Sequence, residues 1–218
     1  MNCPREAGPV AGIDVGGRKK GFHAVALDLA GAVSGRFSSV DPQRIASWCV
    51  ERGVRLVAVD APCAWSVDGR SRPAELALRK VPIQCFSTPS RDAALAHPKD
   101  HYGWMINGER MFQALAPSYP LASEATVDIP GSIETFPQAV ACALAGARVS
   151  AKRKAAVRRE LLRKQGLEMR LLTDIDFVDA ALCAVAARYV LLGKAHAYGE
   201  PLTGLIWVPG SGWSGQPL

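Results

Sequence analysis

The order of four apolar runs in the first 60 residues restricts the folds open to this chain. Three runs are short and separated by turn-forming residues, as expected of consecutive strands. A helix follows over 42–52, with Asp41 as its N-cap, Pro42 at its first position and Gly53 after its end. The fourth run is almost wholly apolar, which is typical of a parallel strand covered on both faces. The runs are residues 9–15, 22–27, 32–37 and 54–59. This order predicts an α/β fold with a mixed sheet, in which a three-strand antiparallel meander adjoins parallel strands and helices flank the sheet.

The chain of 218 residues has the length of a single domain, 1–218, with one insertion. Prolines, glycines and basic residues interrupt the pattern over 62–130, after the fourth strand, so we expect an irregular insertion or lid there. Only two short segments of it, 73–80 and 108–116, have helical character. Beyond it we expect strands at 132–136 and 205–208, helices at 137–147, 150–165 and 173–192, and a mobile tail from Gly210.

The composition of the chain indicates its cellular compartment and the charge of its binding partner. The net charge of +6 and a pI near 9.1 favour an anionic partner such as nucleic acid. Six cysteines are scattered without a paired motif, which indicates a reduced, cytoplasmic protein. No run approaches the roughly 18 apolar residues of a membrane span, so no membrane association is expected. The first eight residues resemble a frayed start, not a targeting peptide.

Several acids stand where apolar elements end or begin. They are Asp14, Asp60, Glu134, Asp176 and Asp179. A buried carboxylate is costly unless it is paired or bound to a metal. Asp14 and Asp60 would be neighbours if their strands pair in parallel, and Asp176 and Asp179, three residues apart, share one helix face. Carboxylates are the ligands preferred by Mg²⁺ and Mn²⁺, so the acids predict a divalent-cation site.

Each acid also has a structural interpretation. Asp174 and Asp176 are in positions that cap a helix, and Asp60 before a proline suits a turn. Glu134 has the alternative of pairing with an arginine of the insertion. His23, on the second strand near Asp14, is interpreted as an ordinary strand residue instead of a proton shuttle. We interpret His97 and His101 as loop histidines, because Pro98 lies between them and no third ligand is evident.

Basic residues form two groups that could contact nucleic acid. One belongs to the strongly basic helix 150–165 and the other to the insertion, where arginines alternate with Trp65, Phe86, Tyr102 and Trp104. Arginines with aromatic residues suit stacking on unpaired bases, and they suit a small hydrophobic core equally well. The candidates are Arg79, Lys80, Arg91, Lys152, Arg153, Lys154, Arg158 and Arg159.

Taken together, these segments resemble a known family. Gly-Ile-Asp-Val-Gly (12–16), the meander and the Asp-x-x-Asp-Ala helix (176–180) resemble the ribonuclease H-like superfamily, with the helix spacing most similar to Holliday-junction resolvases. Together with the first strand, three further segments resemble, more narrowly, the predicted RNase H-like nucleases of domain-of-unknown-function family 429. They are Val-Asp-Ala-Pro (59–62), Ile-Glu-Thr-Phe-Pro (133–137) and Asp-Phe-Val-Asp-Ala-Ala-Leu-Cys-Ala (176–184).

The resemblance implies a metal-dependent nuclease that hydrolyses phosphodiester bonds of DNA or RNA with two Mg²⁺ or Mn²⁺ ions. Asp14 would bridge the metals, Asp60 and Asp179 would each hold one, and Asp176 or Glu134 would complete the site. Two other classes stay open. One is a nucleic-acid-binding module on the same fold, without turnover. The other is an actin-like ATP-dependent phosphotransferase, which would require a tight dimer because this chain has the length of one lobe.

Overall fold

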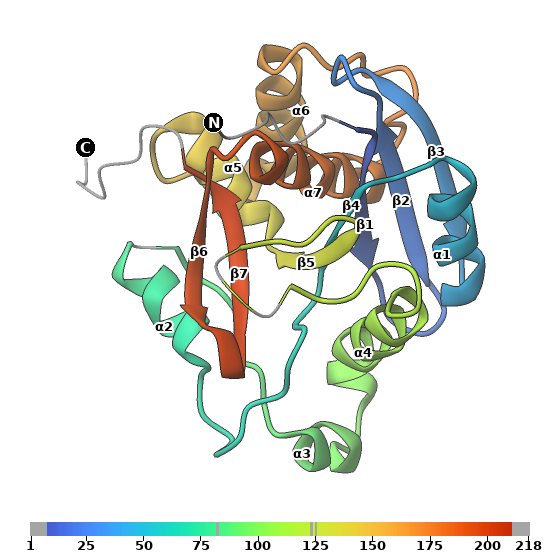
Figure 1. The fold of residues 1–218 in the computed structure, drawn as a ribbon. Helices are drawn as coiled ribbons and strands as arrows, with labels where there is room; N and C mark the ends of the chain where they lie inside the picture. Colours follow the sequence, from blue (N-terminus) through green and yellow to red (C-terminus); the bar gives the residue numbers. More distant parts are fainter. Residues whose placement is uncertain (1–7, 82, 123, 125, 211–218) are drawn as a thin grey trace.

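The computed structural model describes residues 8–81, 83–122, 124 and 126–210. The expectations for the extreme N-terminus and for the tail fall on residues 1–7 and 211–218, outside the described residues. The fold is a seven-stranded sheet in the order β3-β2-β1-β4-β5-β7-β6, with helices on both faces (Figure 1). Its strands are β1 (Val10–Val15), β2 (Phe22–Leu27), β3 (Val33–Ser39), β4 (Leu56–Asp60), β5 (Gly131–Thr135), β6 (Ala195–Glu200) and β7 (Gly204–Pro209).

The pairing confirms the predicted mixed sheet. β1, β2 and β3 form an antiparallel meander, and β1 also pairs with β4 in parallel. The parallel part continues through β5 to β7, and β6 closes the sheet as an antiparallel edge strand. This α/β arrangement is consistent with a ribonuclease H-like sheet. β6 has no counterpart in the sequence prediction.

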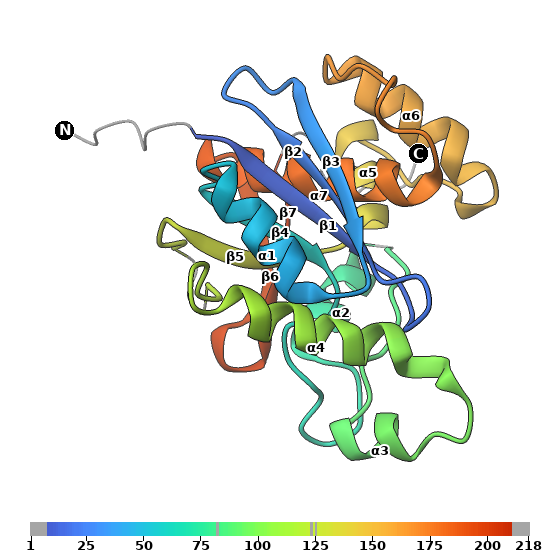
Figure 2. The same ribbon diagram turned by 90° about the vertical axis from the view of Figure 1, so that its right-hand side faces the viewer.

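Helices cover the two faces of the sheet unequally (Figure 2). α5 (Pro137–Ala145), α6 (Lys154–Lys164) and α7 (Ile175–Leu191) pack on one face and form the larger hydrophobic core. α1 (Pro42–Glu51) and α4 (Gly103–Leu115) cover the other face. α7 packs against β1, β2 and β4, and its first turn lies beside the β1–β2 connection, where Lys20 contacts Asp176.

The segment between β4 and β5 is more ordered than the sequence predicts. It carries three α-helices, α2 (Pro73–Lys80), α3 (Arg91–Ala96) and α4, and α4 begins five residues earlier than predicted, at Gly103 and not at 108. Met111 and Leu115 of α4 are fully buried in the second core. The end of this segment is therefore part of the helical layer, and α2 packs against β6 and β7. Among the described residues, no helix is long and apolar enough to cross a membrane.

Candidate metal centre and its cleft

Side chains alternate between the two faces of a strand, and this alternation directs Asp14, Asp60 and His23 to the face covered by α7. Ala11 and Ile13 of β1 belong to the core on the opposite face, so Asp14 points toward α7. The sheet register places Asp14 beside Asp60 of β4 on one side and beside His23 of β2 on the other. Thus the parallel β1–β4 pairing expected for Asp14 and Asp60 is present.

Gly12 allows α7 to approach β1 closely. A Cβ at Gly12 would lie 2.1 Å from both the Ala180 carbonyl oxygen and the Ala184 amide nitrogen. Only a residue without a side chain fits under this helix backbone. The small residues along α7 extend the same close contact, which brings Asp176 and Asp179 over the strand end that carries Asp14.

Asp174 and Asp176, at the start of α7, have different roles. Asp174 is the N-cap, and its carboxylate accepts hydrogen bonds from the backbone amides of Asp176 and Phe177, at 3.0 and 3.1 Å. Capping therefore occupies Asp174, and Asp176 is the acid that meets β1.

Asp14, His23 and Asp176 form a compact set of potential metal ligands. One ligand atom from each lies within 4.8 Å of the other two. The Nδ1 atom of His23 is buried and has no hydrogen-bond partner in the part of the chain that the structure describes. Phe177 packs edge-on against the imidazole, with ring centroids 5.1 Å apart. A histidine ring nitrogen beside two carboxylates is a donor set that fits a cation, a possibility that the sequence interpretation of His23 as an ordinary strand residue did not include.

Basic side chains compensate the acids on α7. The Lys20 ammonium lies 2.6 Å from Asp176, and the Lys154 ammonium lies 3.8 Å from Asp179. The guanidinium of Arg158 is buried in a close ion pair with Asp179 and also donates to the Gln138 side-chain carbonyl at 2.9 Å. Asp179 is therefore bound on its α6 side, outside the ligand set of Asp14, His23 and Asp176.

Burial and mutual repulsion make the acidic cluster electrostatically unfavourable without a cation. Burial, followed by the charges of Asp179 and Asp176, raises the pKa of Asp14 to about 7. Burial, followed by the charges of Asp14 and Asp179, raises the pKa of Asp60 well above its ordinary value. The pKa of Asp179 is raised by burial in spite of Arg158. Each of these shifts favours a bound cation, because a divalent ion stabilises the ionised carboxylates.

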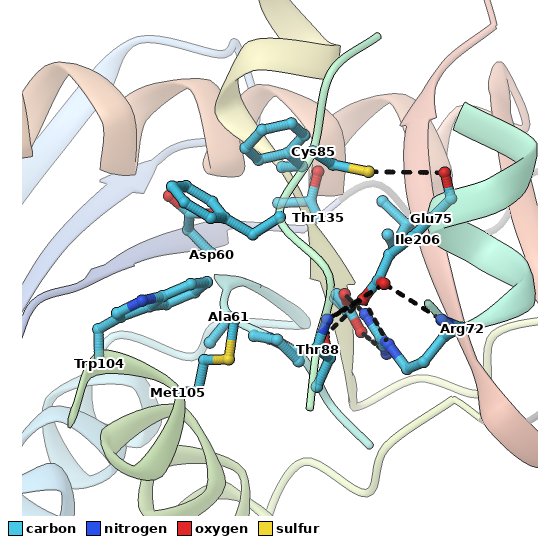
Figure 3. A pocket seen from close by; sticks show the side chains of 14 residues that line it. Asp60, Ala61, Arg72, Glu75, Cys85, Thr88, Trp104, Met105, Thr135 and Ile206 are labelled. Carbon is cyan, nitrogen blue, oxygen red and sulfur yellow. Dashed lines mark hydrogen bonds and ion pairs between the residues drawn. The ribbon is translucent and has the colours of Figure 1, made fainter. Parts of the chain in front are cut away.

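Glu134 lies outside this cluster. It is paired in register with Val59, whose side chain belongs to the core on the opposite face, so Glu134 points away from α7. Arg72 donates two hydrogen bonds to its carboxylate, at 2.6 and 2.9 Å, and the Cys63 amide donates a third at 2.8 Å. Arg72 also binds Glu75, which in turn accepts hydrogen bonds from Thr88 (Figure 3). Glu134 thus anchors the insertion to the sheet, the alternative role that the sequence left open for it.

The acids line the floor of a cleft with a volume of about 900 Å³. Asp14, Asp60, Asp176 and Asp179 all border it, together with Lys20 and aromatic residues of the insertion. Of the basic candidates predicted to bind nucleic acid, Lys152, Lys154 and Arg158 line this cleft.

The other basic candidates are placed elsewhere. Arg79 donates to the Ser87 hydroxyl, Arg91 to Glu109, and Arg159 to the backbone carbonyls of Leu172 and Thr173. The remaining two, Lys80 and Arg153, are exposed and do not line the cleft. The basic side of the cleft therefore comes from the start of α6 and the loop before it.

Fold and site together define an α/β protein with a candidate divalent-cation centre at the carboxyl ends of two parallel strands. The sequence profile of the family described as "Protein of unknown function (DUF429)" matches residues 12–203, and the chain belongs to this family. No curated protein matches the chain. The matched range contains the acids of the cluster, His23, Lys20 and all of α6.

Proposed function

We propose that this protein is a divalent-metal-dependent nuclease of the ribonuclease H-like superfamily. The observation that carries the proposal is the convergence of Asp14, Asp60, Asp176 and Asp179 from two strands and a helix on the floor of one cleft. Such acids clamp Mg²⁺ or Mn²⁺ in enzymes that hydrolyse phosphodiesters. The basic wall and the positive net charge support nucleic acid as the substrate.

The donor set suits such an ion. Asp14, His23 and Asp176 would hold it, and Asp60, next to Asp14, would extend the site toward a second position. A bound divalent ion would polarise a phosphoryl oxygen and lower the pKa of an attacking water. Lys20 and Lys154, both close to the acids, would attract the phosphate and balance its charge. The free thiols of the five described cysteines support a reducing, cytoplasmic location as part of the proposal.

A nucleic-acid-binding module without turnover is the second candidate. The buried ion pair between Arg158 and Asp179 favours it, because the guanidinium already supplies a positive charge to one predicted ligand. This candidate predicts affinity for nucleic acid that needs no metal and survives the loss of Asp14. The nuclease predicts cleavage that requires both.

Calorimetric titration with MnCl₂ and MgCl₂ tests the proposal most directly. We expect the wild type to bind, Asp14→Asn to lose binding, and metal-dependent cleavage of DNA or RNA to disappear with it. Asp92→Asn is the matched control, because Asp92 is an exposed acid on α3, outside the cluster. If Asp14→Asn retains cleavage, or the folded wild type binds neither ion, the nuclease proposal is wrong.

A further inference from the structure

Two aromatic side chains stand in the cleft that contains the acidic cluster. Phe86 comes from the extended segment before α3, and Trp104 from the first turn of α4. Their ring centroids are 6.0 Å apart with an interplanar angle of 61°. Both line the cleft together with Asp14 and Asp60, and Trp104 and Asp60 lie on the same side of the adjoining pocket (Figure 3). We call Phe86 and Trp104 the aromatic pair.

Phe86 is held in an exposed position by its neighbours. Its side chain is 66% exposed, although burying a phenylalanine stabilises a fold by roughly 1.5–3 kcal/mol. On one side, the Cys85 carbonyl accepts a hydrogen bond from Arg79 at 3.5 Å. On the other side, the Thr88 amide and hydroxyl both donate to the buried Glu75 carboxylate. Polar contacts thus hold the chain on both sides of Phe86, and its exposed ring packs edge-on near Trp104.

Another part of the cleft lining is basic. Arg148, Lys152 and Lys154 are exposed, and all three line the same cavity as the aromatic pair. The cleft therefore combines an aromatic wall, an acidic floor and a cationic wall. A ligand that contacts the aromatic, acidic and cationic residues together carries a planar ring and a phosphate. A divalent ion would lie between this phosphate and the carboxylates.

We infer that the cleft binds single-stranded nucleic acid, with an unpaired base stacked on the aromatic pair and the backbone phosphates along Lys152 and Arg148. A base inside a duplex has both faces covered by its neighbours, so it cannot stack on a side chain unless it leaves the helix. An unpaired base has a free face, and aromatic side chains bind such faces with little sequence preference. The inference rests on the proposed function, because the acidic floor would receive the phosphodiester next to the stacked base.

Fluorescence anisotropy with labelled oligonucleotides in the presence of EDTA tests this inference without turnover. Single-stranded DNA and RNA are compared with a duplex of the same sequence. We expect tighter binding of a single strand, and about a 10-fold or greater loss of that affinity in Phe86→Ala, given the usual contribution of one stacked base. Phe86→Tyr keeps an aromatic face and should retain the affinity. Val67→Ala is the control, because Val67 is a 90% exposed apolar residue of the same insertion.

Manganese titration of the same variants separates this inference from the proposed nuclease. Phe86→Ala should bind Mn²⁺ like the wild type, because Phe86 is no part of the acidic cluster. If Phe86→Ala binds single strands as well as the wild type does, or if duplex binds equally well, the stacking inference fails while the metal site stands. Calorimetric binding of AMP without any oligonucleotide binding would also overturn it, since the ligand would then be a free nucleotide. Stacking that depends on Phe86 without Mn²⁺ binding would support the inference and refute the nuclease.

Discussion

In the proposed metal centre, His23 would add a nitrogen donor to ligands that are otherwise carboxylates, and this would affect which ion the centre prefers. Imidazole suits Mn²⁺ and other transition metals better than Mg²⁺, which favours oxygen ligands. We therefore expect His23→Ala to lower Mn²⁺ affinity by about 10-fold or more and Mg²⁺ affinity much less. Calorimetry with both ions measures the ratio. His196→Ala, an exposed histidine of β6, is the control. Equal losses for both ions would show that His23 acts by packing and not as a ligand.

Arg158 and Asp179 are both buried, so removing one charge leaves the other uncompensated. We expect Arg158→Met to lower the free energy of unfolding of the metal-free protein by about 3 kcal/mol. The double variant with Asp179→Asn should lose less, and urea denaturation measures each value. Arg163→Met, which breaks an exposed pair with Glu160 on the same helix, should cost under about 1 kcal/mol. A double variant as unstable as Arg158→Met would mean that the arginine stabilises the fold by packing alone.

At the scale of elements, the position of α7 on β1 depends on Gly12. A methyl group there would overlap backbone atoms of α7, which cannot rotate away as a side chain can. We expect Gly12→Ala to lower the free energy of unfolding by about 3 kcal/mol and to weaken Mn²⁺ binding, because α7 carries Asp176. Chemical denaturation and calorimetry test both effects. Gly17→Ala is the control, since nothing lies within 4 Å of the added Cβ. If Gly12→Ala is destabilised but binds Mn²⁺ as tightly as the wild type does, Mn²⁺ binding does not depend on the position of α7.

Elements with strong local signals were predictable from the sequence. α1 has a capping aspartate followed by proline, α2 begins at a proline, and β1 and β4 are short apolar runs before turn residues. β6 is a half-buried edge strand of alanine, histidine, tyrosine, glycine and glutamate, so it carries little apolar alternation. The start of α4 was missed because its first turn contains a glycine and half-exposed residues, and its burial depends on contacts with α1.

At the scale of the whole molecule, the acids could be predicted one by one, but the register of the sheet was needed to separate Glu134 from the group and to add His23 to it. Asp14 and Asp60 are the last or nearly last residues of adjacent parallel strands, so their proximity followed from strand order alone. Glu134 has the same local signal, yet strand pairing places it on the opposite face beside Val59. The residues next to His23 in the sequence give no indication that it belongs to the cluster. The short connection from β1 to β2 implies a hairpin that sets it opposite Asp14, and that register was the available clue.

The cluster also sets how the stability of the whole protein depends on pH. The pKa of Asp14 is raised from near 4 to about 7, first by burial and then by Asp179 and Asp176, while Lys20 and Lys154 act in the opposite direction. The metal-free folded protein therefore holds a proton that the unfolded chain releases. The contribution of this proton to the free energy of unfolding is complete below about pH 4 and is lost as the pH rises through about 7.

Asp14→Asn has no such proton to lose, so we expect it to be more stable than the wild type in EDTA at about pH 8, by on the order of 2–4 kcal/mol, and by much less at about pH 5. Carboxylates outside the cluster contribute equally to both proteins, so the difference between their unfolding free energies reports Asp14 together with its effect on Asp60. Saturating Mn²⁺ should reverse the order at the higher pH, because the wild type alone keeps the ionised ligand that the ion stabilises. A difference independent of pH would show that Asp14 is ionised in the metal-free fold and that the cluster is already neutralised by its lysines and Arg158.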